Sequence, residues 1–401
     1  MTKLTPSRKT ISRRSLFKIG GGAAIAAAGA HFLPSLLQPT SRASAASPKE
    51  YHLAATDGWL FLPGSVPTFH PDPWAPPPLT TYTFGFRDVT GLTDGQVEDQ
   101  RGRVQAPAPV LWGNQEEETH IKLTNLGFAL RPDLTDGHTI HFHGFRNAIP
   151  LYDGVPEMSI AVPTGRNFTY IYRPHDPGTY MYHCHFEDVE HVSMGMTGVV
   201  FVRPVLGPNY AYNDPATAFD REYPVLLTEL WTQERFEAVH IQEHDWSDYK
   251  PDYWLMNGRS YPDTLEPNGD PMAPANEGTP LQFQPISSLI TANVGQKVLL
   301  RFVNLGYQQQ AMKLDGLNMR VVGKDATLLR GLDSLGVRGG PGSADLSYET
   351  DTIYIGPGES YDAIFTASAA GTYLLYNRNY AYLNNGGSSS YGGQMTKVII
   401  S

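Results

Sequence analysis

Short apolar runs separated by turn-forming residues dominate this chain. Branched or apolar residues fill positions 199–202, 225–228, 298–303 (apart from Arg301) and 398–400, and Gly, Pro, Asn and Asp lie around these runs. Runs of this length and composition predict β-strands, and sustained helical periodicity is scarce. The chain also carries 39 Gly and 32 Pro. We therefore expect an all-β protein made of Greek-key barrels or sandwiches with many turns.

Three segments of the first half recur in the same order in the second half. The pairs are IKLTNLG (121–127) with LRFVNLG (300–306), HTIHFHG (138–144) with QAMKLDG (310–316), and GTYMYHCH (178–185) with GTYLLYNR (371–378). Self-similarity of this kind indicates a duplicated structural unit. We predict two tandem β domains, at residues 47–205 and 223–401, joined by a linker at 206–222.

Residues 1–46 are expected to be a removable export signal. Arg13 and Arg14 form a twin-arginine motif, a Gly/Ala-rich apolar stretch follows, and the small residues at 43–45 suit cleavage. A histidine and a proline interrupt the apolar stretch, which disfavours a membrane anchor. We expect export by the twin-arginine (Tat) route, to the periplasm or the outside of the cell.

Charge and cysteine content narrow the possible partners. Loss of the export signal changes the formal net charge from −10 to −17, because that segment carries seven Lys and Arg and no Asp or Glu. Such an acidic protein is a poor partner for nucleic acid or an anionic membrane surface. A single cysteine excludes an intramolecular disulfide.

That cysteine, Cys184, has an unusual set of neighbours. His183 and His185 flank it, His191 and Met196 follow on the same short segment, and the HTIHFHG motif lies upstream. One thiolate with histidines and a methionine is the ligand set of a blue-copper site, whereas structural zinc sites favour more cysteines. An inert buried thiol is the alternative. The surrounding histidines make copper chemistry the better interpretation.

These motifs resemble those of multicopper oxidases of the two-domain, laccase-like type, with blue copper in the first domain. The resemblance runs from about residue 109 to the C-terminus and includes the phrases DGVP (153–156), PTG (163–165), PGTY (177–180) and MNGRSYP (256–262). It implies two cupredoxin-like domains. It also implies one-electron oxidation of a phenolic or metal-ion substrate at a type 1 copper, with O2 reduced at a cluster of type 2 and type 3 coppers.

The resemblance also assigns metal ligands. Matches to type 1 ligands are His138, Cys184, His191 and Met196, and matches to cluster ligands are His141, His143, His183 and His185. Met194 is a weaker candidate for the axial ligand. Neighbouring residues of a strand point to opposite faces, so Cys184 can face one copper while His183 and His185 face the cluster. Such an arrangement gives a very short path for electrons.

Two carboxylates match residues that handle protons in this family. Asp153 matches an acid near the cluster, and Glu187 matches one that relays protons to bound oxygen. Reduction of O2 to water consumes protons, which gives a buried carboxylate near the metal a chemical role. The alternative for each residue is an ordinary surface or turn carboxylate.

The second half departs from the family pattern. Gln310, Lys313 and Asp315 stand where the first half has histidines, and no histidine follows His244. The second domain therefore cannot supply cluster ligands, and we expect it to face away from the metal. A homo-oligomer, dimer or trimer-based, would complete the cluster if two copies of the first domain met across a two-fold axis. Otherwise the four cluster histidines hold one or two coppers.

Two other functions fit part of the pattern. A periplasmic blue-copper electron-transfer or copper-binding protein would need no oxygen chemistry. A copper nitrite reductase is less favoured, because that family has Asp at the position of His141 and lacks the histidine at position 185. Copper stoichiometry separates an oxidase from a carrier.

Overall fold

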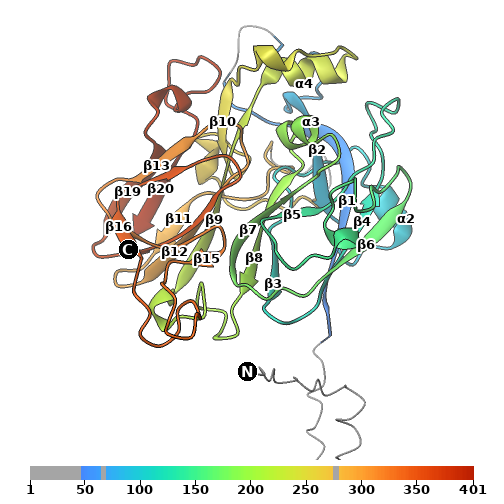
Figure 1. Ribbon diagram of the computed structural model, residues 1–401. Coiled ribbons are helices and arrows are strands. Elements are labelled where there is room, and N and C mark those ends of the chain that lie inside the picture. The colour runs from blue at the N-terminus through green and yellow to red at the C-terminus, as the bar shows by residue number, and fades with distance from the viewer. Residues whose placement is uncertain (1–46, 65–68, 274–279) are drawn as a thin grey trace, which may run out of the picture. The chain divides into compact units, whose positions relative to one another are not determined.

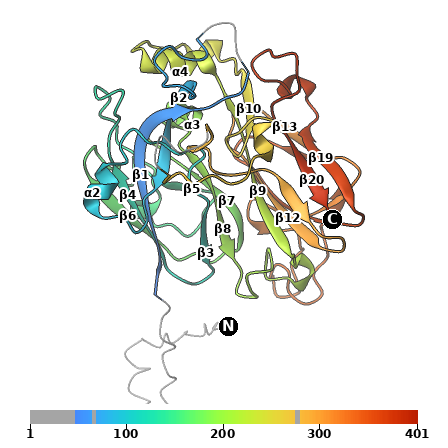
Figure 2. The same cartoon turned by 180° about the vertical axis from the view of Figure 1, so that it is seen from behind.

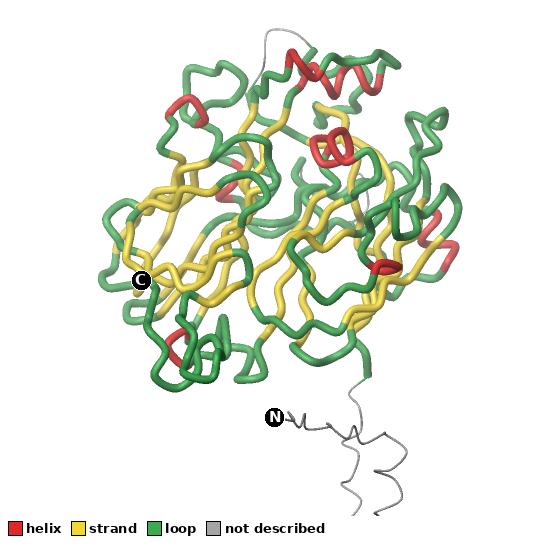
Figure 3. Tube along the Cα trace, viewed as in Figure 1, coloured by secondary structure: helices red, strands yellow, loops and turns green. Residues whose placement is uncertain are grey.

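The structure is a computed structural model that describes residues 47–64, 69–273 and 280–401 (Figure 1). The expected export signal lies outside the described residues. Strands dominate the described part (Figure 3), and its α-helices are short: α2 (Asp94–Glu98), α3 (Asp188–Met194) and α4 (Thr232–Val239). None of these helices is long and apolar enough to cross a membrane. The predicted all-β class is confirmed.

The first half forms two four-stranded sheets, in the orders β2-β1-β4-β6 and β3-β8-β7-β5. Their strands are β1 (Lys49–Leu60), β2 (Thr81–Asp88), β3 (Leu111–Asn114), β4 (Thr119–Asn125), β5 (His141–His143), β6 (Asn167–Tyr172), β7 (Gly178–His183) and β8 (Thr197–Arg203). Apolar side chains from both sheets, among them Phe84, Ile121 and Tyr182, share one core. These two sheets and their core are called the first sandwich below.

The second half forms the second sandwich, with sheets in the orders β10-β9-β12-β18-β14-β15 and β11-β20-β19-β13-β17, and with β16 paired to β14. Its strands are β9 (Arg221–Leu230), β10 (Tyr253–Met256), β11 (Ile290–Ala292), β12 (Lys297–Asn304), β13 (Gln310–Leu314), β14 (Met319–Lys324), β15 (Thr327–Leu328), β16 (Tyr348–Thr350), β17 (Thr352–Ile355), β18 (Ser360–Thr366), β19 (Gly371–Asn377) and β20 (Met395–Ile400). A separate core that includes Leu300, Met312 and Phe365 lies inside it.

The strand order of the first sandwich recurs in the second. The series β2-β1-β4-β6 matches β10-β9-β12-β18, and β3-β8-β7-β5 matches β11-β20-β19-β13. Parallel pairs fall at matching places: β1 with β4 and β9 with β12, then β3 with β8 and β11 with β20. The same topology twice is what the repeated motifs predict. The exact domain limits, 47–205, 206–222 and 223–401, remain a prediction.

The two sandwiches lie side by side and contact each other through β7 and β8 of the first and β9, β12 and β18 of the second (Figure 2). Met181 packs with Leu226 in an apolar cluster shared by both sandwiches. Beside it, Thr179 Oγ1 donates to Asp362 Oδ1 over 2.6 Å, and Arg301 Nη1 donates to Thr179 Oγ1 over 2.9 Å. Buried apolar and polar contacts therefore join both sandwiches in one compact unit.

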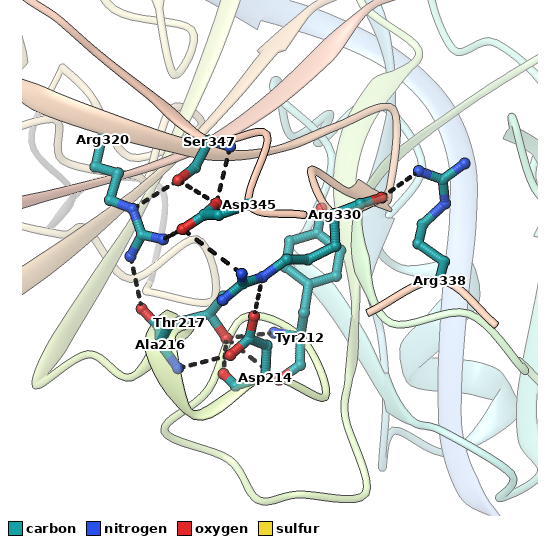
Figure 4. Close-up of polar contacts among 9 residues, drawn as sticks. All are labelled: Tyr212, Asp214, Ala216, Thr217, Arg320, Arg330, Arg338, Asp345 and Ser347. Carbon is teal, nitrogen blue, oxygen red and sulfur yellow. Dashed lines mark hydrogen bonds and ion pairs between the residues drawn. The ribbon is translucent and has the colours of Figure 1, made fainter. Parts of the chain in front are cut away.

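Ion pairs attach the segment that joins the sandwiches to the second one (Figure 4). Arg330 Nε lies 2.8 Å from Asp214 Oδ2, and Arg330 Nη1 lies 3.7 Å from Asp345 Oδ2. Arg320 pairs with the same Asp345 carboxylate at 2.9 Å and donates to the Ala216 carbonyl over 3.2 Å. Single surface pairs contribute little, but a connected set of partly buried charges holds a segment in one place.

Candidate metal centre

Strand β7 places the histidines and the cysteine on opposite faces. Thr179 and Met181 contact the second sandwich, whereas Tyr182 and Cys184 belong to the core of the first. His183 lies between Tyr182 and Cys184 in sequence, and its partner across the sheet is His141 of β5. The alternation of a β-strand thus separates a buried thiol from a group of histidines on the other face.

The first group gathers around the Cys184 sulfur. Its Sγ lies 3.2 Å from His191 Nδ1 and 3.8 Å from His138 Nδ1. His138 and His191 are almost fully buried, like the thiol itself. Two atoms that bind one metal at roughly 2.0–2.3 Å lie about 3.3–3.8 Å apart in trigonal or tetrahedral geometry. The three donor atoms are therefore spaced as ligands of a single ion.

The chemistry of this donor set fits a thiophilic metal. Burial raises the pKa of the Cys184 thiol to about 11, and burial lowers the pKa of His191 to about 4. Neutral imidazoles are ready to bind a metal, and a bound cation ionises a coordinating thiol that would otherwise stay protonated. The backbone N–H of Thr139 also points at the sulfur over 3.4 Å. Thr139 is a contact that the sequence motifs did not indicate.

Helix α3 and the turn after it return the chain to the site. Gly195 ends the helix with φ 116°, a left-handed conformation that favours glycine. The next residue, Met196, is fully buried, and its carbonyl accepts a hydrogen bond from the Cys184 N–H over 3.1 Å. Met194 is equally buried. Met196 stays the predicted axial ligand, because a backbone hydrogen bond holds it next to Cys184.

The second group lies on the opposite face of the sheet. Donor atoms of His141, His143 and His183 lie within 4.8 Å of one another. His141 Nδ1 donates to the Asp153 carbonyl over 2.6 Å, and His183 Nδ1 donates to the Cys184 carbonyl over 2.8 Å. These bonds leave Nε2 of both rings free, as is typical of metal-binding histidines.

The fourth predicted cluster ligand, His185, lies beside this group. Its ring centroid is 5.0 Å from that of His141 and 5.6 Å from that of His183. The backbone N–H of His185 donates to Thr139 Oγ1 over 2.9 Å. All four histidines predicted from the sequence are thus brought together, and the Cys184 residue between two of them joins the two groups.

The two predicted carboxylates occupy different places. Asp153 lies in the histidine group, where its Oδ1 is 3.7 Å from His141 Nδ1. Glu187 lies in the thiol group, since its carboxylate, that of Asp136 and a nitrogen of His191 fall within 4.8 Å of one another. Asp136 was not predicted from the sequence. Its position two residues before His138 was the available signal.

Residues from the second half of the chain brace the helix that carries His191. Glu234 and Arg235 of α4 are fully buried against it, and in Figure 1 α4 lies next to α3. Ser193 Oγ donates to Glu234 Oε2 over 2.6 Å, and Arg235 Nη2 donates to the Ser193 carbonyl over 2.6 Å. Tyr307 donates its hydroxyl proton to the carbonyl of Val189, also in α3. The position of α3, and with it that of His191, therefore depends on contacts with a distant part of the sequence.

The prediction that the second sandwich faces away from the metal is wrong for one loop. A Cβ atom added to Gly358 would lie 3.2 Å from His143 Nε2, and the φ of Gly358 is +76°. The prediction rested on β13, whose Lys313 instead pairs with Asp351 at 2.8 Å. The loop before β18 approaches His143, whereas β13 lies elsewhere. The absence of histidines from β13 therefore says nothing about the contact between this loop and His143.

In the second sandwich, amide side chains occupy the positions that match the predicted metal ligands. Gln310 and Asn377 match His138 and Cys184 in the sequence repeat. Asn377 Nδ2 donates to Gln310 Oε1 and to Gln394 Oε1, both over 2.7 Å, and all three residues are buried. A cluster of amides thus fills the space that the thiol and imidazole fill in the first sandwich, and the amides satisfy one another's hydrogen bonds.

Buried carboxyl groups next to α3 predict a pH dependence of stability. Burial raises the pKa of Glu234 to about 8 and that of Glu229 to about 7, from an ordinary 4.5. The folded state holds these protons more tightly than the unfolded state does. The two carboxyl groups therefore contribute fully to the stability of the folded state below about pH 4.5, and this contribution is lost as pH rises towards 8. We expect the free energy of unfolding of the wild type, relative to that of Glu234→Gln, to fall between about pH 5 and pH 8.

Thermal unfolding of the two metal-free proteins across this pH range measures the difference. A difference that is constant, or that grows with pH, would contradict the assignment of a raised pKa to Glu234.

Comparisons with known proteins agree with this geometry. Two family models, both described as multicopper oxidase, match residues 103–206 and 221–399. Among solved structures, the blue copper oxidase from Nitrosomonas europaea has a TM-score of 0.63 at 24% identity, covering 88% of this chain and 86% of that one. The multicopper oxidase mgLAC has a TM-score of 0.62 at 21% identity, covering 88% and 87%. At these identities, the likeness concerns the fold.

Curated relatives share a smaller part of their length. Oxidoreductase OpS5 of Beauveria bassiana is 24% identical over 72% of this chain and 42% of its own length. Laccase-7 of Oryza sativa subsp. japonica is 25% identical over 65% of this chain and 41% of its own. Laccase-2 of Botryotinia fuckeliana is 26% identical over 59% and 35%. The chain spans less than half the length of these relatives.

Proposed function

This chain belongs to the multicopper oxidase family, whose members bind copper at a type 1 site and in a trinuclear cluster, and we propose that it is a laccase-like oxidase. Its reaction would be one-electron oxidation of a phenolic or metal-ion substrate, with O2 as the electron acceptor. One observation carries the proposal. The Cys184 sulfur lies between His138 and His191 on one face of the sheet, and His183 next to Cys184 belongs to the histidine group on the other face.

The proposed ligands divide between the two groups described above. The type 1 ligands are His138, Cys184, His191 and Met196, and the cluster ligands are His141, His143, His183 and His185. Copper, when bound, supplies reversible one-electron redox chemistry at the first group and O2 reduction at the second. The protein supplies a covalent path of adjacent residues between the two groups, and burial excludes water from the thiol.

The chain's own residues also fix orientation and handle protons. The Asp153 carbonyl holds His141 in the tautomer that leaves Nε2 free, and the Asp153 carboxylate is near enough to deliver protons to this face. Glu187 was predicted to be a second proton carrier. Its carboxylate lies beside His191 in the thiol group, and the relay of protons from there stays a prediction.

We propose that the cluster is completed by a second copy of this chain. The first sandwich offers four histidines, and the second sandwich has none after His244. Leaving several copper ions short of donor atoms is costly, so metal binding and subunit association would be coupled. Export of the folded protein by the Tat route is also part of this proposal, since such a route suits a protein that loads its metal before transport.

Copper content and assembly are expected to change together. The holoprotein should contain one type 1 copper per chain plus cluster copper shared between copies, up to about four coppers per complete site. Removal of copper should weaken subunit association by about tenfold or more, and His141→Ala should do the same. Sedimentation of apo and holo forms, with copper analysis of each, makes the measurement.

Two outcomes would change the proposal. Equal association constants for apo and holo protein, or a monomer that retains the cluster copper, would exclude a shared cluster. One copper per chain without O2 uptake would indicate an electron carrier instead of an oxidase.

A further inference from the structure

A cleft of about 580 Å3 opens between the two sandwiches. Val110 lines it on the side of the first sandwich, and Pro224, Ile286 and Leu289 line it on the side of the second. All four residues are only half-buried, so they present uncovered apolar surface to the cleft. A volume of several hundred Å3 with mainly apolar walls is typical of a site for a small organic molecule.

The cleft lies away from both metal groups. Strand β8 reaches it at Phe201, whose partner on β7 is Thr179. At the other end of the same pair of strands, the partner of His183 is Thr197. Phe201 and Thr197 are separated by about 13 Å of strand, at about 3.3 Å per residue. A ligand in the cleft therefore does not touch the residues predicted to hold copper.

The basic groups at the cleft already have acidic partners. Arg301 Nη2 lies 3.0 Å from Glu222 Oε2, and Arg301 Nη1 lies 3.3 Å from Asp362 Oδ1. Arg203 forms a second ion pair with Glu222. The Arg301 side chain is 0% exposed, so it offers no free cationic surface to a ligand. These residues therefore give the cleft no positive charge with which to hold an anion.

Two hydrogen-bond acceptors of the cleft remain available to a ligand. Asp88 Oδ1 accepts the backbone N–H of Thr90 over 2.9 Å, but this carboxylate forms no ion pair with any described residue. Gln105 also lines the cleft and is only 4% exposed, and its Oε1 is buried without a hydrogen-bond partner among the described residues. A buried acceptor without a donor costs free energy. Gln105 thus gives independent evidence for a ligand that carries N–H or O–H groups.

We propose that this cleft binds a primary organic amine with an apolar body. An ammonium group carries three donors and no acceptor, which matches the Asp88 carboxylate and Gln105 Oε1. The apolar body covers the walls formed by Val110, Ile286 and Leu289. The protein is acidic as a whole, which also attracts a cation. Binding involves no covalent step, and the inference goes beyond the proposed oxidase function and does not rest on it.

Occupation of the cleft should stabilise the contact between the sandwiches. Its walls come from both halves of the chain, so unfolding or separation of the sandwiches destroys the site. A ligand that binds only the folded protein raises its free energy of unfolding in proportion to the logarithm of ligand concentration. The unfolding temperature is therefore expected to rise as the amine is added.

Titration calorimetry of the copper-loaded protein with 2-phenylethylamine tests the site. Near neutral pH this amine is protonated, so it has no lone pair for copper, and it has no phenol group to be oxidised. The matched control ligand is 2-phenylethanol, which has the same shape and a hydroxyl in place of the ammonium. We expect 2-phenylethanol to bind about tenfold or more weakly than the amine, since hydrogen bonds to charged groups are the stronger ones.

Two variants locate the site. Asp88→Asn should weaken binding of 2-phenylethylamine about tenfold or more, and the asparagine oxygen can still accept the Thr90 N–H. Gln105→Leu should also weaken binding and should leave the unfolding temperature of the free protein unchanged or raised, because Oε1 has no protein donor to lose. Asp94→Asn is the control, since it removes the same charge from a side chain that is 99% exposed.

Three results would overturn the inference. The first is no binding of 2-phenylethylamine and no rise in unfolding temperature. The second is equal weakening by Asp88→Asn and Asp94→Asn, which would indicate attraction to the acidic surface as a whole. The third is equal affinity for 2-phenylethanol, which would exclude amines as the ligand class. None of these measurements depends on O2 uptake, so failure of the proposed oxidase function would leave them unchanged.

Discussion

Cys184→Ser is expected to abolish the blue absorption of the copper-loaded protein and to lower substrate oxidation by more than about 100-fold, since even residues that only orient ligands matter 10–100-fold. The colour arises from charge transfer between a thiolate and copper, and a serine hydroxyl cannot replace that thiolate. The change is small in volume, so the fold should persist. Visible absorption, copper analysis and the unfolding temperature together measure the effect.

Copper in the histidine group provides the internal control for this variant. His141, His143 and His183 keep their positions in Cys184→Ser, so cluster copper should be retained while type 1 copper is lost. A wild-type protein that binds its full copper content and remains colourless would exclude the blue-copper assignment.

Arg235→Met is expected to lower the free energy of unfolding by about 2–5 kcal/mol, since each buried acceptor left without its donor costs about 1–3 kcal/mol. Arg235 is buried, and it donates to the carbonyls of Tyr82 and Ser193 over 2.8 and 2.6 Å. Methionine would leave both carbonyls without these donors and would remove the positive charge beside Glu234. Because Ser193 belongs to α3, the blue absorption band should also shift. Denaturant unfolding and visible spectra check both effects.

Two further variants define the cause. Gln233→Ala, at a half-buried position of the same helix, should change stability by no more than about 0.5 kcal/mol. Above about pH 8, where the Glu234 carboxyl ionises, Glu234→Gln combined with Arg235→Met should recover part of the loss, because no buried carboxylate is then left without its cation. Equal destabilisation by Gln233→Ala and Arg235→Met would show that the helix as a whole, rather than the guanidinium, matters.

Local sequence patterns were sufficient to predict the fold and the gathering of these side chains in two groups, whose metal-binding roles stay predictions. The repeated phrases correspond to the same strand order in both sandwiches, because each phrase encodes a strand and its turn. The sequence His183-Cys184-His185 predicted a thiol and histidines on opposite faces, since a strand alternates its side chains over two residues. These predictions depend on neighbours along one strand, and such neighbours are visible in a sequence.

Contacts between distant segments could not be predicted in the same way. The support of α3 by Glu234 and Arg235 joins residues about forty positions apart, and the sequence of α4 carries no metal-site motif. The position of Gly358 beside His143 depends on how the sandwiches pack. Asp136 was missed because a single aspartate before a histidine is common. Its proximity to Glu187 and His191 is set by the fold and not by the local sequence.

The brace between α4 and α3 has a consequence for biosynthesis. A ribosome releases the cysteine and histidines of the first sandwich well before it makes Glu234, Arg235 and Tyr307, which hold the metal-bearing helix in place. A nascent chain that has only its first half therefore carries the ligands without their support. Stable acquisition of copper would then wait for the second half to be translated and folded. The second half of the chain, which lacks the predicted metal ligands, thus sets the time at which the first half can hold copper stably.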